Sequence, residues 1–568
     1  LDRVRPAWRA ERVGLILGTS SGGMRAAERA FDAAARGQRW DDLEAATYYG
    51  PMARAARRLG RSLDPCVLVL GACASSTIAV GLASRWLERG SCDLVLAGGF
   101  DEVTVFVAAG FESLRAVTET PPPRPFRTGR DGMSLGEGAC VLALARARAC
   151  GRPPPLVIAG FGIASDGVHL TAPDREGGGL ARAASAALEE AGQPVVDLVS
   201  AHATATPFND ASESRALARV LGAARAREVV VHPFKAQIGH TLGAAGVLEL
   251  LGAIDAIERG VLPAAAGEGE LDPDAPARLL PRTETGSPRT ALKISSAFGG
   301  ANAALVLGDG RGAIARPRRA AYVYQAAHID REPEIEELAA ATAAPVDRLL
   351  RADPLVRLAL AAIARLQATT GPLAGAGVVV GTALATLETN ALFAARIRER
   401  GARAAEPRRF PYTSPNAVAG ECSIVFRMTG PSFSVGGGMH AGIEALAAAA
   451  LLVEGGDADR VVVVSVDDVG PATIALGETS LRAGAVAVLL ASRPIAGARA
   501  RVGAIELRRG AAVDGRHGRV HEAGGHQAGA PHAGGHHALL PLLQREMPRE
   551  LVGASPPDAF ARLVLDPV

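Results

Sequence analysis

One cysteine stands where the sequence changes abruptly from one pattern to another. Cys73 follows the short apolar run 67–70 and precedes a small-residue stretch beginning at Ala74, which predicts a sharp turn from a buried strand into a helix. Amides and the dipole at a helix start favour a thiolate over a thiol and can donate hydrogen bonds to an oxyanion. The alternative is a buried structural cysteine, which is what most free cysteines are.

Two histidines and a lysine complete a candidate site. His202 ends a predicted strand in SAHATATPFND, and His240 lies at a glycine-rich turn into a predicted helix, five residues after Lys235. Only two of the 61 basic residues are lysines, Lys235 and Lys293. Either histidine alone would more often be an ordinary interior or surface residue. A nucleophile-type cysteine with two histidines at strand ends is, however, typical of thiol-based acyl transfer.

Strand and helix patterns alternate along the chain, which predicts a layered α/β fold. Strands are expected at 13–17, 67–70, 94–97, 139–144, 156–160, 229–231 and 291–294, and alanine-rich helices at 24–35 and 180–191.

A later part of the chain repeats the first. Residues 378–382 (VVVGT) mirror 15–19 (LILGT), and the eight residues from Pro65 to Cys73 are matched by the eight from Pro431 to Met439. In both copies an aspartate follows twenty residues further on. This spacing indicates an internal duplication, in which Met439 takes the place of the cysteine.

These patterns divide the chain into five parts: two halves of a first unit at 1–150 and 151–310, a linker at 311–320, the repeat at 321–495 and a tail at 496–568. The tail is too short to repeat the second half. Between residues 514 and 537 it holds six of the twelve histidines. Such a tract can bind metal, but its irregular spacing defines no ligand set, so a flexible loop or linker is expected.

Composition excludes several classes of function. A net charge of +2 gives no electrostatic case for nucleic acid, and no apolar run reaches the roughly 18 residues that span a bilayer. The six cysteines show no CxxC or metal-ligand spacing, which with no recognisable signal peptide favours the cytoplasm. The chain starts at Leu1 within an arginine-rich segment, so we expect N-terminal sequence to be missing.

Five stretches, in order, resemble the β-ketoacyl-acyl-carrier-protein synthases, the condensing enzymes of fatty-acid and polyketide synthesis. They are GACASS around Cys73, PFRTGRDGMSLGEGA from Pro125, HATATPFND from His202, KAQIGHTLGAAGVLE from Lys235 and SAFGGAN ending at Asn302. The resemblance covers roughly residues 13–308. It implies a thiolase-like, five-layered αβαβα architecture, with the repeat as a second, partial thiolase-like domain. The family's first strand is not found in this chain's sequence.

The resemblance also implies a reaction. Cys73 would take an acyl chain from an acyl carrier protein, and His202 and His240 would hold the thioester carbonyl of malonyl-carrier protein during decarboxylation. The resulting carbanion would attack the acyl group and release a β-ketoacyl product. Backbone amides of Cys73 and Phe298 would form the oxyanion hole, with Phe298 also gating entry.

Other residues would support this site, and the resemblance implies no metal or cofactor. Lys235 and Glu249 would form an orienting charged pair. Thr204 and Thr206 belong to the family's HGTGT motif, which reads HATAT here, so we expect an altered backbone near His202. Ser296 and Ala297 replace a phenylalanine and a glycine of the gating stretch.

The repeat resembles the chain-length factors, the inactive partners of paired condensing enzymes, and in its short form the partner subunits of aryl-polyene-type pathways. The thioether of Met439 cannot form a thiolate. Such partners dock against the active subunit and shape its acyl pocket, so we expect either a homodimer or an intramolecular active–inactive pair. A decayed duplication without a role is the alternative.

The predicted function is therefore condensation in polyketide, aryl-polyene-type or specialised fatty-acid synthesis, with acyl- and malonyl-loaded carrier proteins as partners. A general fatty-acid elongation synthase and a non-catalytic scaffold that binds carrier protein remain as alternatives.

Overall fold

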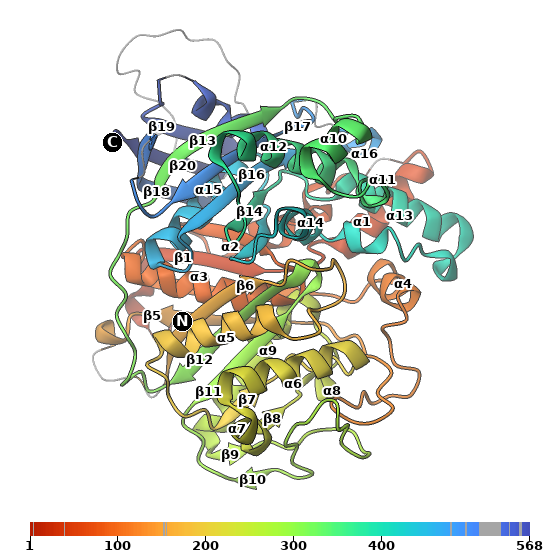
Figure 1. The fold of residues 1–568 in the computed structure, drawn as a ribbon, viewed down its shortest axis with the longest axis vertical. Coiled ribbons are helices and arrows are strands. Elements are labelled where there is room, and N and C mark those ends of the chain that lie inside the picture. Colours follow the sequence, from red (N-terminus) through yellow and green to blue (C-terminus); the bar gives the residue numbers. More distant parts are fainter. Residues whose placement is uncertain are drawn as a thin grey trace.

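The computed structural model describes the chain except residues 4, 39, 151–153, 155, 477–479, 495–496, 511–534, 545 and 556–558. Within this part there are two main sheets and a two-stranded one that pairs β9 (Val261–Leu262) with β10 (Glu284–Thr285) (Figure 1). The large one has the strand order β19-β20-β18-β13-β17-β16-β14-β15-β3-β1-β4-β5, with β2 (Ser62–Leu63) paired to β18. The other main sheet, called the small sheet, has the order β6-β12-β11-β7-β8.

Three parts of the chain build these sheets. The first copy (residues 13–145) contributes β1 (Val13–Gly18), β3 (Cys66–Leu70), β4 (Leu94–Asp101) and β5 (Gly138–Ala145). The small-sheet unit (residues 157–308) contributes β6 (Val157–Ser165), β7 (Leu198–Ser200), β8 (Val230–His232), β11 (Ala291–Ser296) and β12 (Ala301–Gly308). The second copy (residues 322–491) contributes β13 (Tyr322–Ile329), β14 (Gly377–Gly381), β15 (Ser432–Val435), β16 (Arg460–Asp467) and β17 (Gly484–Ala491).

Five layers are present in the first copy with its small-sheet unit, as predicted. Helices α3 (Ser75–Arg89) and α9 (Ala245–Arg259) lie between the two sheets. The outer face of the small sheet is covered by α5 (Gly178–Glu190) and α6 (Pro207–Leu221), and that of the large sheet by α2 (Gly50–Arg58). Strands β1 and β3 are buried along their whole length because both of their faces are covered, which explains their continuous apolar runs.

The duplication is structural as well as sequential. In the first copy β1 lies between β3 and β4, all parallel, and in the second copy β14 lies in the same way between β15 and β16. Strands β3 and β15 pair antiparallel, with Leu70 opposite Ser434 and Val69 opposite Val435. The two copies therefore share one continuous sheet, and the predicted intramolecular pair is present in the chain. In the second copy β13 pairs with the outer edge of β17. In the first copy β5, which corresponds to β17, has no such partner and forms the edge of the sheet.

No small sheet accompanies the second copy in the described part of the chain. Instead the tail adds β18 (Ala500–Gly510), β20 (Ala559–Asp566) and β19 (Glu550–Ser555) to the large sheet beyond β13, and these strands pack on α15 (Ala441–Gly455). Most of the histidine-rich tract falls outside the described residues. Its last two histidines, His536 and His537, lie in a 3-10 helix, Gly535–Leu543, that packs against α15 and β16.

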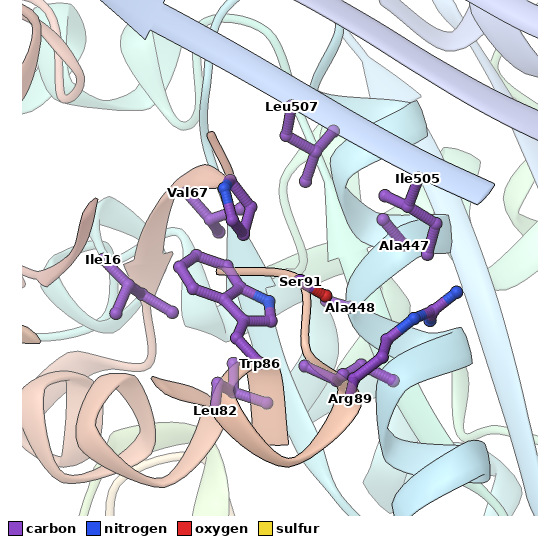
Figure 2. A pocket seen from close by; sticks show the side chains of 12 residues that line it. Ile16, Val67, Leu82, Trp86, Arg89, Ser91, Ala447, Ala448, Ile505 and Leu507 are labelled. Carbon is purple, nitrogen blue, oxygen red and sulfur yellow. The ribbon is translucent and has the colours of Figure 1, made fainter. Parts of the chain in front are cut away.

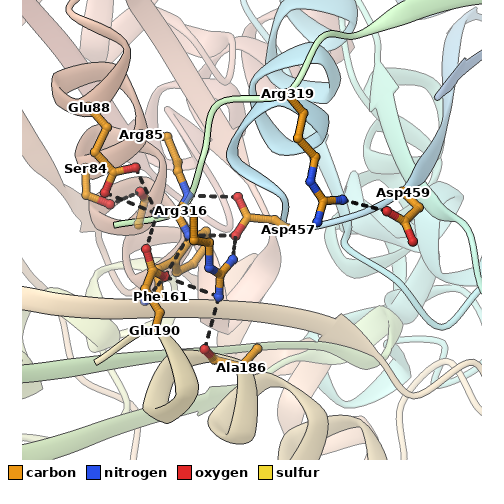
Figure 3. Close-up of polar contacts among 11 residues, drawn as sticks. Ser84, Arg85, Glu88, Phe161, Ala186, Glu190, Arg316, Arg319, Asp457 and Asp459 are labelled. Atoms are coloured by element: carbon orange, nitrogen blue, oxygen red, sulfur yellow. Dashed lines mark hydrogen bonds and ion pairs between the residues drawn. The ribbon is translucent and has the colours of Figure 1, made fainter. Parts of the chain in front are cut away.

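A buried ionic junction ties the three parts together (Figure 3). Arg85 of α3 donates from Nη1 to Glu190 Oε1 at the end of α5 over 2.6 Å, and from Nη2 to Asp457 Oδ1 beyond α15 over 2.7 Å. Arg316, in the predicted linker, lies 3.2 Å from the same Asp457 oxygen. Each part of the chain thus supplies one member of the junction.

No helix in the described residues is long and apolar enough to cross a membrane.

The interface between the copies is closely packed beside this junction. Between α3, α15 and β18 there remains a cavity of only about 20 Å³, bordered by Trp86, Arg89, Ala448 and Leu507 (Figure 2). A space of this size holds at most a water molecule or two.

The remaining helices of the second copy cover the opposite face of the sheet and the region between the copies. They are α10 (Ile335–Thr342), α11 (Val346–Arg351), α12 (Pro354–Thr370), α13 (Leu387–Arg400), α14 (Asn416–Phe426) and α16 (Pro471–Ala475). Of these, α13 lies against α1 (Met24–Ala35) of the first copy.

Candidate active site

Cys73 lies on the predicted turn between strand and helix. Strand β3 ends at Leu70, a 3-10 turn covers Ala72–Ala74, and α3 begins at Ser75. The Ser75 Oγ atom accepts a hydrogen bond from the Gly71 N–H over 2.9 Å and donates to the Ala72 carbonyl over 2.6 Å. Ala72 has a φ of 47°, a conformation that is strained for alanine.

Burial of Cys73 opposes the thiolate that the helix start favours. Burial raises the pKa of the Cys73 thiol to about 12, against the lowering effect of Lys235. The side chain is almost inaccessible, at 8% exposed. Loss of solvation therefore outweighs the helix start, and the unacylated site holds a thiol.

His202 and His240 come together above this turn. Their ring centroids are 5.6 Å apart and the rings are nearly perpendicular, at 88°. The 3-10 turn Leu242–Ala244, directly after His240, packs on the Cys73 turn, and Leu242 lines the same small chamber as Cys73. The structure thus brings together the cysteine and both histidines that the sequence singled out.

Both imidazoles are neutral. Burial, followed by the positive charge of Lys235, holds the pKa of His202 and His240 well below the usual value. The His240 Nδ1 atom accepts a hydrogen bond from the Leu242 N–H over 3.0 Å, and the Lys235 ammonium lies 3.3 Å from His202 Nδ1. With each Nδ1 acting as an acceptor, each neutral ring carries its proton on Nε2.

A buried charge cluster fixes His202 from behind. Lys235 Nζ donates to the His202 carbonyl over 2.6 Å and pairs with Glu249, as predicted. The other Glu249 oxygen lies 2.6 Å from the ammonium of Lys293. The role of Lys293 was missed, although the rarity of lysine in this chain was a usable signal.

The HATAT stretch keeps a glycine-like backbone. Ala203 and Ala205 have φ values of 43° and 59°, in the left-handed region that costs alanine about 1–2 kcal/mol per residue. The Glu213 carboxylate accepts hydrogen bonds from the backbone N–H groups of His202 over 2.6 Å and Ala203 over 2.8 Å. The hydroxyl groups of Thr204 and Thr206 form a hydrogen bond with each other over 3.0 Å. Glu213 carried no distinguishing sequence signal.

Phe298 opens a 3-10 turn, Phe298–Gly300, at the mouth of the site. Its ring lines the Cys73 chamber, 5.8 Å from the ring of Phe111. Its backbone N–H has no acceptor among the described residues. This amide is therefore free to bind an oxyanion near Cys73.

Two cavities near Cys73 share part of their lining. A chamber of about 50 Å³ holds the cysteine among apolar side chains, and a cavity of about 630 Å³ lies between α1 of the first copy and α13 and α16 of the second. Ser21, Met24 and Tyr48 line both. The Tyr48 hydroxyl is held by the second copy, accepting from Asn390 Nδ2 over 3.0 Å and donating to the Thr413 carbonyl over 2.9 Å.

The Met439 turn of the second copy is closed by the tail. Asp101 Oδ2 in the first copy accepts the N–H of Gly243 over 2.6 Å, whereas Asp467 Oδ2 in the second accepts the N–H of His536 over 2.7 Å. The Gly535 N–H donates to the Met439 carbonyl over 2.7 Å. The tail thus takes the place that the small-sheet unit takes in the first copy.

No group of three or more His, Cys, Asp or Glu side chains in the described part of the chain is arranged to hold a metal ion. That part of the histidine-rich tract which is described contributes only His536 and His537.

Known proteins resemble the chain over most of its length. The model "Beta-ketoacyl synthase, N-terminal domain" matches residues 3–149 and 293–483, and "Beta-ketoacyl synthase, C-terminal domain" matches 156–267. A putative polyketide beta-ketoacyl synthase 1 of Streptomyces cyaneus is 33% identical over 320 residues, covering 52% of this chain and 75% of the relative. The 3-oxoacyl-[acyl-carrier-protein] synthase 2 of Staphylococcus aureus is 32% identical over 315 residues, covering 52% and 77%.

One solved structure is similar in fold across both copies. The "PfaC Keto synthase-Chain length factor" has a TM-score of 0.70 at 19% identity, covering 88% of this chain and 68% of that chain.

Proposed function

Because this chain belongs to the β-ketoacyl synthase family, we propose that it joins an acyl group held on Cys73 to malonyl-loaded acyl carrier protein by decarboxylative Claisen condensation. The observation that carries the proposal is the pair of neutral imidazoles, His202 and His240, each with an Nε2–H donor beside a buried cysteine.

The first step loads the enzyme. The Cys73 sulfur attacks the thioester carbonyl of acyl-carrier protein, the carrier's thiol leaves, and the Cys73 proton departs with it. The step consumes one thiol and one thioester and forms one of each. The proton balance is therefore the same when the resting Cys73 thiol has a raised pKa. The N–H groups of Cys73 and Phe298 stabilise the tetrahedral oxyanion.

The second step forms the carbon–carbon bond. The Nε2–H groups of His202 and His240 donate to the malonyl thioester carbonyl, so that electrons released by loss of carbon dioxide form a stabilised enolate. The ammonium of Lys235 beside His202 adds positive potential. The enolate carbon attacks the acyl carbonyl, the Cys73 sulfur leaves and is reprotonated, and β-ketoacyl-carrier protein is released.

The second copy shapes the acyl pocket. A chamber of about 50 Å³ beside Cys73 holds only a short acyl chain, whereas the 630 Å³ cavity beyond Tyr48 is within the range of sites for drug-sized ligands. One wall of that cavity is formed by α13 and α16 of the second copy. This arrangement favours extended acyl chains of polyketide, polyene or specialised fatty-acid type over the alternative, general fatty-acid elongation.

The alternatives, the partners and the location follow from this proposal. A non-catalytic scaffold is disfavoured because the two histidines, Lys235 and Glu249 are assembled around Cys73. Acyl- and malonyl-loaded carrier proteins are the proposed partners. A cytoplasmic location is supported by the six free cysteine thiols.

The test follows the two steps. The full chain is incubated with radiolabelled acyl-carrier protein and then with malonyl-carrier protein. We expect label on the protein, release of carbon dioxide, loss of label in Cys73→Ala and its retention in Met439→Ala. An unlabelled wild-type protein that releases no carbon dioxide overturns the proposal.

A further inference from the structure

The Phe298 turn belongs to the small-sheet unit, but a helix of the second copy holds it. Asn416, the first residue of α14, donates from Nδ2 to the Phe298 carbonyl oxygen over 2.8 Å. A Cβ atom added to Gly420 would come within 2.5 Å of Gly299 Cα, and one added to Gly299 would come within 2.6 Å of Asn416 Nδ2. The turn and α14 are thus in direct contact, with no intervening side chain.

Two other hydrogen bonds hold the turn. The Gly299 N–H donates to the Leu170 carbonyl over 2.7 Å, and the Gly300 carbonyl accepts the Asp166 N–H over 2.8 Å. Both glycines have positive φ, at 82° and 72°, a backbone conformation that glycine adopts without steric cost. The Phe298 carbonyl and the Gly299 N–H belong to one planar peptide group, so the hydrogen bonds from Asn416 and to Leu170 hold that peptide from its two ends.

Stability does not explain an asparagine at position 416. The residue is fully buried, and in the described part of the chain its Oδ1 atom has no hydrogen-bond partner. An unsatisfied buried acceptor is unfavourable and offsets part of what the hydrogen bond from Nδ2 contributes to stability. The presence of an amide is explained by the one hydrogen bond that its Nδ2 atom donates, to the Phe298 carbonyl.

The internal repeat supplies a control. Asn416 lies fifteen residues before Pro431, and the residue fifteen before Pro65 is Gly50, which likewise begins a helix, α2. Helix α2 packs against β18 of the tail, where the described residues include no counterpart of the Phe298 turn. The amide is thus present in the copy that faces the turn, and the other copy has no side chain at that position.

We propose that Asn416 is a positioning residue for the reaction at Cys73, through which the second copy holds the Phe298 turn closed over the acyl-enzyme. This inference rests on the proposed condensing activity. A loosened turn admits water to the Cys73 thioester, whose acyl–sulfur bond is then hydrolysed to a free acid and the Cys73 thiol. Condensation and hydrolysis compete for one acyl-enzyme, so their ratio reports on the turn.

The experiment measures β-keto product against free acid, starting from acyl-loaded full-length protein and malonyl-carrier protein. In Asn416→Leu we expect the product-to-acid ratio to fall about tenfold, the effect of one hydrogen bond. The matched control is Ser423→Ala, on the same helix, which loses only the 3.0 Å hydrogen bond to Ser432 Oγ. Its ratio should stay at the wild-type value.

A second variant separates positioning from general damage. In Asn416→Asp only the protonated carboxyl can donate to the Phe298 carbonyl, and burial raises the pKa of such a group. Its product-to-acid ratio should therefore recover as pH falls, whereas that of Asn416→Leu should not. The inference is overturned if Asn416→Leu keeps the wild-type ratio, or if Asn416→Asp shows no recovery. A wild-type protein that forms no β-keto product overturns the proposed function instead.

Discussion

Cys73 and Met439 occupy the same turn in two copies of one fold, and their surroundings differ more than the two side chains do. Around Cys73 the small-sheet unit supplies two imidazoles, two lysines and a glutamate. Around Met439 the tail supplies backbone N–H groups from Gly535 and His536, which occupy the acceptors instead. Activity in this fold thus depends on what faces the turn as much as on the residue that the turn carries.

Backbone strain also differs between the two turns. The residue before Cys73 is an alanine with φ of 47°, while the residue before Met439 is Gly438 with φ of 90°. Ala203 and Ala205, beside His202, are strained as well. Of the five alanines with positive φ in the described residues, these three lie at the proposed active site and two, Ala343 and Ala385, lie in the second copy.

The largest difference between the two turns should appear on removing an imidazole. His202→Ala or His240→Ala should lower the condensation rate about 10²–10³-fold, as loss of an oxyanion-type donor does, while loading of Cys73 persists. His536→Ala, at the Met439 turn, should leave the rate unchanged. Carbon dioxide release measures the rate. Equal losses in all three variants would contradict the division between the copies.

A smaller effect is expected where the second copy lines the 630 Å³ cavity. Ala395→Trp on α13 fills that cavity, so loading of Cys73 with a dodecanoyl group should fall several-fold while butyryl loading is unchanged. Leu392→Trp is the control, since Leu392 lies on the same helix and is 58% exposed. Intact-mass measurement of the loaded protein gives both values. If the dodecanoyl group loads equally well in both variants, the chain does not enter the cavity.

The smallest effect concerns the backbone before each turn. Ala72→Gly should raise the free energy of unfolding by roughly 0.5–1 kcal/mol because it relieves a left-handed alanine, and Gly438→Ala should lower it by a similar amount. A Cβ atom at Gly438 would meet the Tyr49 ring at 3.5 Å, an ordinary contact, so the change reports conformation alone. Chemical denaturation measures both. Changes of the same sign would show that the turns are not equivalent.

Much of the site could be predicted because its signals are local. Cys73, His202, His240 and Lys235 each sit at a change of pattern, and the helix expected at 24–35 is α1, Met24–Ala35. Glu213 and Asn416 could not be found this way, since a buried carboxylate or amide acquires its role only through partners distant in sequence.

The tail strands and the protonation state of Cys73 could not be predicted from the sequence, for two different reasons. Strands β18, β19 and β20 are fixed by long-range pairing, which no short window of sequence contains. The state of Cys73 depended on burial, and the pattern at a helix start carries no information on how deeply the turn is covered.

The tail segment at the Met439 turn has a consequence for the second copy. A Met439→Cys reversion would restore a thiol, but in the described residues the Gly535 and His536 N–H groups of the tail still occupy the Met439 carbonyl and Asp467. Changing that one residue would therefore leave the surroundings of the turn as they are. The tail segment at Gly535 and His536 would also have to move before the second copy could present a site of its own.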